Sequence, residues 1–222
     1  EPQDYHPCNM GYYYNGRLYG CHDHPPARDV ATAIQHSCNA YFFQVLRDIV
    51  EVEEYTKPEI GLDSMAGYLH DFGLGHSLGV DISAESPGLI PTSSYYDKLY
   101  PKEKGAWRSP YIMSIGIGQG EVELTTLQMA NLAAVIANRG CYYTPHLIRS
   151  LSDEAPLPEE YLKKHCVDID DHYFEPVIDG MERVVAAGTG FTARVDDIAI
   201  CGKTGTSQNP HGEDHSVFFA FA

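Results

Sequence analysis

The sequence lacks a run of about 18 consecutive apolar residues, so no membrane-spanning helix is expected within it. No signal-peptide pattern and no internal repeat is visible either. Cations are scarce: 15 lysines and arginines stand against 31 aspartates and glutamates, which gives a net charge of −16. Phosphate contacts need clustered Lys and Arg, so this balance argues against nucleic acid as a partner.

Cysteine is too sparse for a small disulfide-stabilised scaffold. Six cysteines are spread over 222 residues, and a chain of this length can bury a core of its own. Cys141 and Cys201 lie in apolar runs, where we expect buried free thiols.

Hydrophobic periodicity divides the chain into helices and antiparallel strands. Apolar residues at three- and four-residue spacing predict helices at 29–50, 61–73, 125–138 and 174–187. Apolar runs predict strands at 141–150, 197–206 and 215–222, the last two forming a hairpin. We expect segment 5–25 to be irregular, 76–110 to be a loop with short strands, and 152–171 to be exposed. Because helices and strands are segregated, the sequence predicts an α+β fold.

A short polar motif stands out on the predicted strand near the C-terminus. Lys203, Thr204, Gly205 and Thr206 follow an apolar run, so a cation and two hydroxyls lie on a strand edge. Lys203 and the hydroxyls can hold a substrate carboxylate, and Gly205 lets a peptide approach the strand closely. The backbone N–H of Thr206 is a candidate donor to an oxyanion.

A second motif, Ser37-Cys38-Asn39, lies in the predicted helix 29–50. Residues i and i+2 do not share a helix face, but they can converge on one site at a turn that enters a helix. Ser37 can then relay a proton to a leaving amine, and Asn39 can bind a substrate amide. Taken alone, either motif is more typical of a solvent-exposed turn or helix surface.

A third block connects the two motifs. It comprises a Gly-Gln-Gly segment within 115–121, an alanine-rich stretch over 125–140 that opens on a Thr-Thr-Leu-Gln capping box, and the segment 143–148. With the two motifs in this order, the chain resembles the transpeptidase domain of class B penicillin-binding proteins, in particular the elongation type. The resemblance implies a penicillin-binding (β-lactamase-like) fold with an antiparallel sheet and a helical subdomain. We expect one incomplete domain over 1–222, with an irregular part (1–28), a mainly helical part (29–140) and a sheet part (141–222).

The resemblance also implies an activity and a site. Ser37, Asn39, Lys203, Thr204, Gly205 and Thr206 are expected to line the site where a D-alanyl-D-alanine stem peptide, or a β-lactam that mimics it, is attacked. The expected function is peptidoglycan D,D-transpeptidation without a catalytic cofactor. Implied partners are a glycan polymerase and shape-determining membrane proteins, and the implied location is the bacterial inner membrane with this domain facing the periplasm.

One departure from the family pattern limits this expectation. No serine in the chain is followed three residues later by lysine, so the nucleophile motif is missing. We expect it upstream of Glu1, in a longer parent protein, and we expect this fragment alone to be inactive. The alternative function is a catalytically silent domain that senses β-lactams or muropeptides.

A separate group of cysteines and histidines lies near the N-terminus. Cys8, Cys21, His24 and Cys38 offer four ligands that suit a structural, tetrahedral Zn²⁺ site, with His22 as the substitute for His24. Such a site would fasten the segment 5–25 to the Ser37 turn. A Cys8–Cys21 disulfide and unpaired thiols remain the alternatives.

Overall fold

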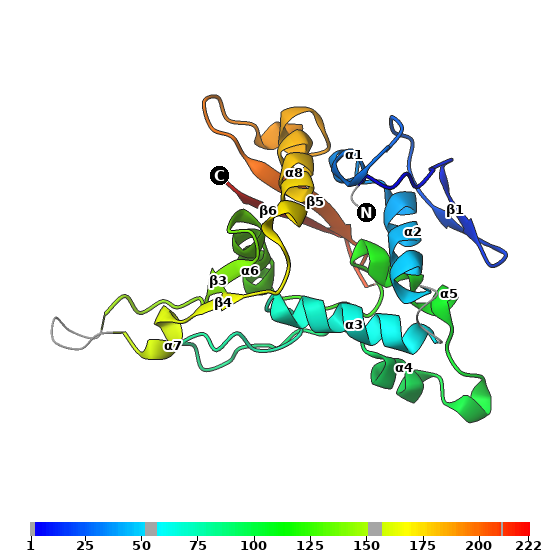
Figure 1. The fold of residues 1–222 in the computed structure, drawn as a ribbon, viewed down its shortest axis with the longest axis horizontal. Coiled ribbons are helices and arrows are strands. Elements are labelled where there is room, and N and C mark those ends of the chain that lie inside the picture. Colours follow the sequence, from blue (N-terminus) through cyan, green and yellow to red (C-terminus); the bar gives the residue numbers. More distant parts are fainter. Residues whose placement is uncertain (1–2, 52–56, 151–156, 210) are drawn as a thin grey trace.

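The computed structural model of the chain describes residues 3–51, 57–150, 157–209 and 211–222. Helices and three separate two-stranded antiparallel sheets make up this part, which confirms the predicted α+β class (Figure 1). None of the described helices has the length and hydropathy needed to cross a bilayer.

Strand pairs lie at both ends of the described chain, and its middle part is mainly helical. The strands are β1 (Gly11–Tyr14), β2 (Arg17–Gly20), β3 (Cys141–Tyr143), β4 (Lys164–Cys166), β5 (Cys201–Ser207) and β6 (His215–Phe221). The α-helices are α1 (Val30–Gln35), α2 (Asn39–Val50), α3 (Pro58–Asp71), α4 (Ser93–Leu99), α5 (Ser109–Ile112), α6 (Thr126–Ala137), α7 (Glu159–Leu162) and α8 (Glu175–Ala187). Short 3₁₀ turns occur at Lys102–Lys104, Met113–Ile117, Asp171–Tyr173 and Phe191–Ala193.

The predicted helix 29–50 is two helices, not one. Asp29 caps α1 through a reciprocal capping box with Thr32. The helix stops at the Ser37 turn because Ser37 adopts a φ of 55°, in the left-handed region. Cys38 then caps α2, and its Sγ accepts a hydrogen bond from the backbone N–H of Tyr41. The break therefore places the Ser-Cys-Asn motif at the entrance of a helix.

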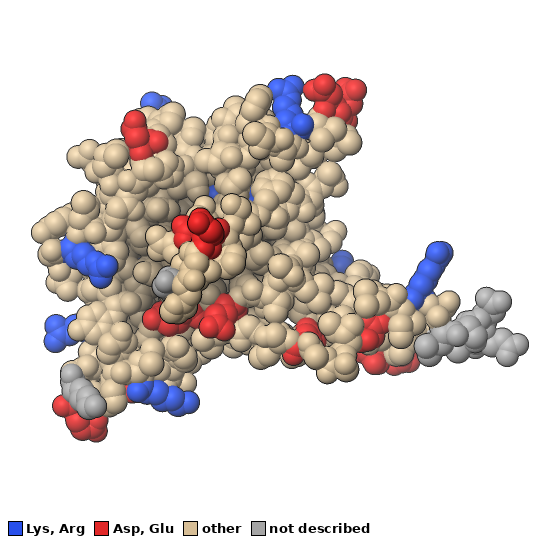
Figure 2. Space-filling model, turned by 180° about the vertical axis from the view of Figure 1, so that it is seen from behind, with Lys and Arg blue, Asp and Glu red and all other residues tan. Residues whose placement is uncertain are grey.

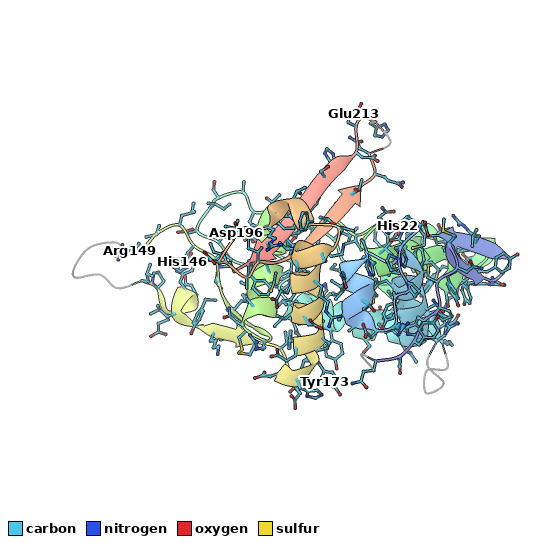
Figure 3. All side chains as sticks on the ribbon, turned by 90° about the horizontal axis from the view of Figure 1, so that it is seen from above. His22, His146, Arg149, Tyr173, Asp196 and Glu213 are labelled. Carbon is cyan, nitrogen blue, oxygen red and sulfur yellow. A yellow bond between two sulfur atoms is a disulfide. The ribbon has the colours of Figure 1, made fainter. Side chains whose placement is uncertain are left out.

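The C-terminal hairpin lies against α8. β5 and β6 pair from Cys201↔Phe221 to Ser207↔His215. Ile34, Met181, Val184 and Cys201 belong to one apolar cluster, which packs α1 and α8 onto the hairpin (Figure 1). The hairpin projects from the helices, with Glu213 near its tip (Figure 3). This packing brings β5 next to the α1–α2 break.

Other expectations need correction. Within 5–25, β1 and β2 form a hairpin around Asn15 and Gly16. Within 76–110 the structure has helix α4, and β3 covers only three residues of the predicted strand 141–150. The predicted α6 is confirmed, including the capping box between Thr125 and Gln128.

The expected free thiol at Cys141 is wrong. Cys141 lies opposite Cys166 in the β3–β4 pairing, and the two form a disulfide. Cys201 is a buried free thiol, as predicted. On the face shown in Figure 2, Lys and Arg side chains lie scattered, and they form no continuous basic patch there.

Candidate active site and metal centre

Lys203 and Ser37 meet although 166 residues separate them. The Nζ of Lys203 donates to the Oγ of Ser37 at 2.7 Å and to the backbone carbonyl of Thr204, also at 2.7 Å. β5 supplies the lysine and the left-handed turn between α1 and α2 supplies the serine. The structure thus brings the two sequence motifs into one polar site, while the catalytic roles of their residues remain predictions.

The ammonium group of Lys203 is poorly hydrated. Burial lowers its pKa to about 8, because a charged amine loses solvation free energy inside the protein. Near neutral pH the group is therefore mostly charged but close to its titration midpoint. A lysine in this state can both stabilise negative charge and exchange a proton with Ser37.

The two threonines of the motif lie on the other face of β5. Side chains alternate along a strand, so Thr204 and Thr206 share one face and Lys203 lies on the opposite one. Thr206 and Gly205 are exposed, and Thr204 is partly buried. Within the described residues β5 pairs only with β6, so its second edge can accept an extended peptide.

Asn39 begins α2, beside the serine turn. Its side chain is partly buried, and it makes no hydrogen bond within the described part of the chain. An amide with free donors and a free acceptor is suited to a peptide group of a substrate.

Sequence reasoning missed two polar residues next to β5. Gln119 donates from Nε2 to the carbonyl of Thr206 at 3.4 Å, and Thr189 lies 2.8 Å from Thr204 between their Oγ1 atoms. Each lies between two glycines, and a polar residue flanked by glycines is the signal that could have revealed them. A cavity of about 490 Å³ lies beside Gln119, between the loop 118–122 and the hairpin residues 207–209 and 214.

The four predicted metal ligands come together. One ligand atom from each of Cys8, Cys21, His24 and Cys38 lies within 4.8 Å of the other three. Cys8, Cys21 and Cys38 carry free thiols, so the alternative Cys8–Cys21 disulfide is not formed in this structure. Three thiols and an imidazole at this spacing suit the tetrahedral coordination of Zn²⁺.

Hydrogen bonds distinguish His24 from its substitute. The Nδ1 of His24 lies 2.7 Å from the carbonyl of Pro25, while its Nε2 faces the Sγ of Cys21 at 3.4 Å. A ring whose Nδ1–H donates to a carbonyl presents a free Nε2, as metal-binding histidines do. His22 also bonds a carbonyl, that of His36, but its other ring nitrogen lies 4.0 Å from the Sγ of Cys21, farther than His24, so the geometry favours His24.

The thiols strongly affect one another. The pKa of Cys21 is lowered to about 4, chiefly because Cys38 donates a hydrogen bond to it. The pKa of Cys38 is raised for the same reason and by burial. Without a cation, a second thiolate in this cluster is unfavourable because it would lie beside the first. A divalent metal ion would favour deprotonation of the thiols instead.

Comparison with known proteins identifies the family. The family described as "Penicillin binding protein transpeptidase domain" matches residues 1–222. A curated relative, the peptidoglycan D,D-transpeptidase MrdA of Acinetobacter baumannii, is 30% identical over 178 residues, which cover 79% of this chain and 24% of the relative. The chain thus spans about a quarter of the length of that relative.

Solved structures agree with this assignment. Pseudomonas aeruginosa PBP2, solved in complex with WCK 5153, has a TM-score of 0.75 and 27% identity, covering 96% of this chain and 45% of that one. Helicobacter pylori PBP2, solved in complex with MreC, has a TM-score of 0.65 and 23% identity, covering 98% and 37%, and shows the shared fold. The chain belongs to the penicillin-binding protein transpeptidase domains, and it is of the PBP2 type.

Proposed function

We propose that the parent protein, which contains this chain, is a serine-type peptidoglycan D,D-transpeptidase that cross-links the cell wall and is inhibited by β-lactams. The observation that carries the proposal is the hydrogen bond between Lys203 and Ser37, which joins two active-site motifs beside an open strand edge. Curated relatives that are named as transpeptidases support it. They also make a silent sensor of β-lactams or muropeptides the less favoured function.

The substrate is a stem peptide that ends in D-alanyl-D-alanine. It lies along the free edge of β5, where Gly205 leaves room for its backbone. The hydroxyls of Thr204 and Thr206 hold its terminal carboxylate, and the positive charge of Lys203 strengthens this binding from the opposite face. The N–H of Thr206 stabilises the oxyanion, and Asn39 binds a peptide amide.

The reaction is an acyl transfer in two steps. A serine from a part of the parent protein outside these 222 residues attacks the penultimate D-Ala carbonyl, and the lysine of its motif takes the serine proton. The C–N bond breaks, and terminal D-Ala leaves with the proton that the motif lysine took, which Ser37 relays to the leaving amine while Lys203 stays charged and holds the Ser37 hydroxyl in place. An amine of a neighbouring stem peptide then attacks the ester, and its proton returns to the serine oxygen. No metal or organic cofactor takes part in these steps.

Two cavities along α2 provide room for the segment that carries this serine. One, of about 520 Å³, includes Val30, Tyr41 and Val177 in its lining, and the other, of about 210 Å³, is almost entirely apolar. Phe42, Val45 and Ile49 line both. An apolar helix packed here would cover this face of α2 and run beside the Ser37 turn.

Cys8, Cys21, His24 and Cys38 would hold a structural zinc ion. The ligand distances and the free Nε2 of His24 support this assignment. Because Cys38 lies between Ser37 and Asn39, the ion would fix the turn that carries both of these site residues.

Partners and location follow from relatives. The H. pylori PBP2 that shares this fold was solved with MreC, which supports a shape-determining partner for the parent protein. A glycan polymerase is the second expected partner, since cross-linking acts on newly made strands. The parent protein is expected to be anchored in the inner membrane with this domain in the periplasm.

Covalent labelling by a fluorescent penicillin tests the proposal. The full-length parent protein should be labelled, and Lys203→Ala should reduce its labelling rate by about 100-fold or more, as does the loss of one oxyanion-hole donor. Lys164→Ala on the exposed strand β4 is the control and should label normally. The 222-residue chain alone should remain unlabelled. An unlabelled parent protein, or a labelled fragment, would overturn the assignment.

A further inference from the structure

The turn that follows α8 connects the two halves of the site. The backbone N–H groups of Gly188 and Gly190 both donate to the carbonyl of Val184, at 3.1 and 3.0 Å, so the turn folds back onto the last turn of the helix. Thr189 lies at its tip, between the two glycines. This residue belongs to neither of the two sequence motifs.

Close packing fixes the turn in place. A Cβ added at Gly188 would lie 2.6 Å from the carbonyl oxygen of Gln35, at the end of α1, and a Cβ at Gly190 would meet Val184 at 2.9 Å. On the hairpin side, the ring of Phe218 lies against Gly190 and covers Gly202. The turn is therefore held between the approach to Ser37 and the β5–β6 hairpin, with no room for side chains at its two glycines.

Thr189 uses this fixed position to contact Thr204. Their Oγ1 atoms lie 2.8 Å apart, so one hydroxyl donates to the other. A hydroxyl has one proton and two lone pairs. If Thr204 donates to Thr189, it presents only lone pairs to a ligand, whereas if it accepts, its proton is free to point at an anion.

We propose that Thr189 is a positioning residue that donates to Thr204 and so directs the hydroxyl of Thr204 toward the terminal carboxylate of the substrate. The inference rests on the proposed function, in which Thr204 binds that carboxylate. A carboxylate that accepts from Thr204 also strengthens the hydrogen bond that Thr189 donates to Thr204, because each hydrogen bond in such a series polarises the next. A ligand with a neutral group at this point gains much less, so the pair selects for a free carboxylate.

Acylation of the full-length protein by benzylpenicillin, and by its methyl ester, tests the inference. Thr189→Val should slow acylation by benzylpenicillin about three- to ten-fold, the effect of one hydrogen bond, and leave the ester rate unchanged. Thr189→Ser keeps the hydroxyl and should restore the rate. Thr192→Val, at an exposed threonine in the same loop that makes no hydrogen bond in the described structure, is the matched control and should react like the wild type.

A double-mutant cycle separates positioning from a general structural effect. The variant that carries both Thr189→Val and Thr204→Val should react no more slowly than Thr204→Val alone, because Thr189 acts through Thr204. Independent, multiplying losses would overturn the inference, as would an equal loss with the ester. If Thr204→Val itself leaves acylation by benzylpenicillin unchanged, the carboxylate assignment under the proposed function fails instead, and the inference fails with it.

Discussion

The ammonium group of Lys203 donates to the hydroxyl of Ser37 at 2.7 Å, and the same ammonium is buried enough that its pKa falls to about 8. The contact is therefore made at an energetic cost, since the folded protein holds a proton on Lys203 less tightly than the unfolded chain does. Such a cost is common at sites where a charge serves chemistry rather than stability.

This cost makes the stability of the chain depend on pH. Below about pH 8 the burial penalty of Lys203 is fully present, and it disappears as the pH rises toward the ordinary lysine value of 10.5. Lys203→Met should therefore be more stable than the wild type at pH 7, by on the order of 1–2 kcal/mol. Urea unfolding at pH 7 and 10.5 measures this. The difference should shrink at the higher pH, and a difference independent of pH would show that burial of the charge is not its cause.

Metal analysis should find one zinc ion per chain. His24→Ala should weaken zinc binding by about 100-fold or more, since loss of a supporting group alone costs 10- to 100-fold. His22→Ala should retain the metal, because His22 lies outside the cluster of four ligand atoms, with its Nδ1 4.0 Å from the Sγ of Cys21. Cys201→Ser is the control for removal of a thiol outside the cluster. A zinc-free protein whose mass is four hydrogens below the fully reduced value, two for Cys141–Cys166 and two more, would favour the Cys8–Cys21 disulfide.

Reduction of the Cys141–Cys166 disulfide should destabilise the chain. The bond closes a loop with a sequence separation of 25, for which constraint of the unfolded chain predicts about 3.5 kcal/mol. Thermal unfolding with and without a phosphine reductant measures the loss. The variant Cys141→Ala/Cys166→Ala should unfold at a lower temperature than the wild type, and the reductant should not lower that temperature further. If that variant still responds to the reductant, the effect originates at another cysteine.

Two glycines of α3 should respond in opposite directions to alanine. A Cβ at Gly67 meets nothing within 4 Å, so Gly67→Ala should stabilise the chain by about 1 kcal/mol through helix propensity. A Cβ at Gly61 would lie 2.5 Å from the carbonyl oxygen of Ile49 and 2.6 Å from Val50, so Gly61→Ala should destabilise by about 1–3 kcal/mol. Denaturant unfolding of both variants measures the change in the free energy of unfolding. Equal changes of the same sign would show that Gly61 of α3 does not pack against the end of α2.

Local signals in the sequence predicted structure reliably. The capping box that opens α6 is formed, because Thr125 and Gln128 are only three positions apart. The four residues of the proposed zinc site could be selected by residue type, with His22 left open as a substitute for His24, and the structure brings the four together. The break at Ser37 could not be predicted, since apolar spacing continues across it and a left-handed residue leaves no mark in the periodicity.

Longer-range contacts depend on strand register and on the packing of helices against strands, which local sequence patterns do not predict. The Cys141–Cys166 disulfide follows from the register of β3 with β4, and the contact of Thr189 with Thr204 follows from the packing of α8 on the hairpin. The β1–β2 hairpin could have been predicted from local sequence, because Asn15-Gly16 between two tyrosine-rich runs is a strong turn signal. The overall composition of segment 5–25 instead suggested an irregular structure.

The pairing of Lys203 with Ser37 has a consequence for how the protein is made. The proposed metal ligands all lie within the first 38 residues, whereas β5 is among the last segments of this chain to leave the ribosome. Contacts of such high sequence separation form late, because a long loop must close before they contribute. We expect amides of α2 to gain protection from hydrogen exchange before those of β5 during refolding, and simultaneous protection would contradict this order. The site would then be completed only after the part that carries Ser37 and the proposed metal ligands is already folded.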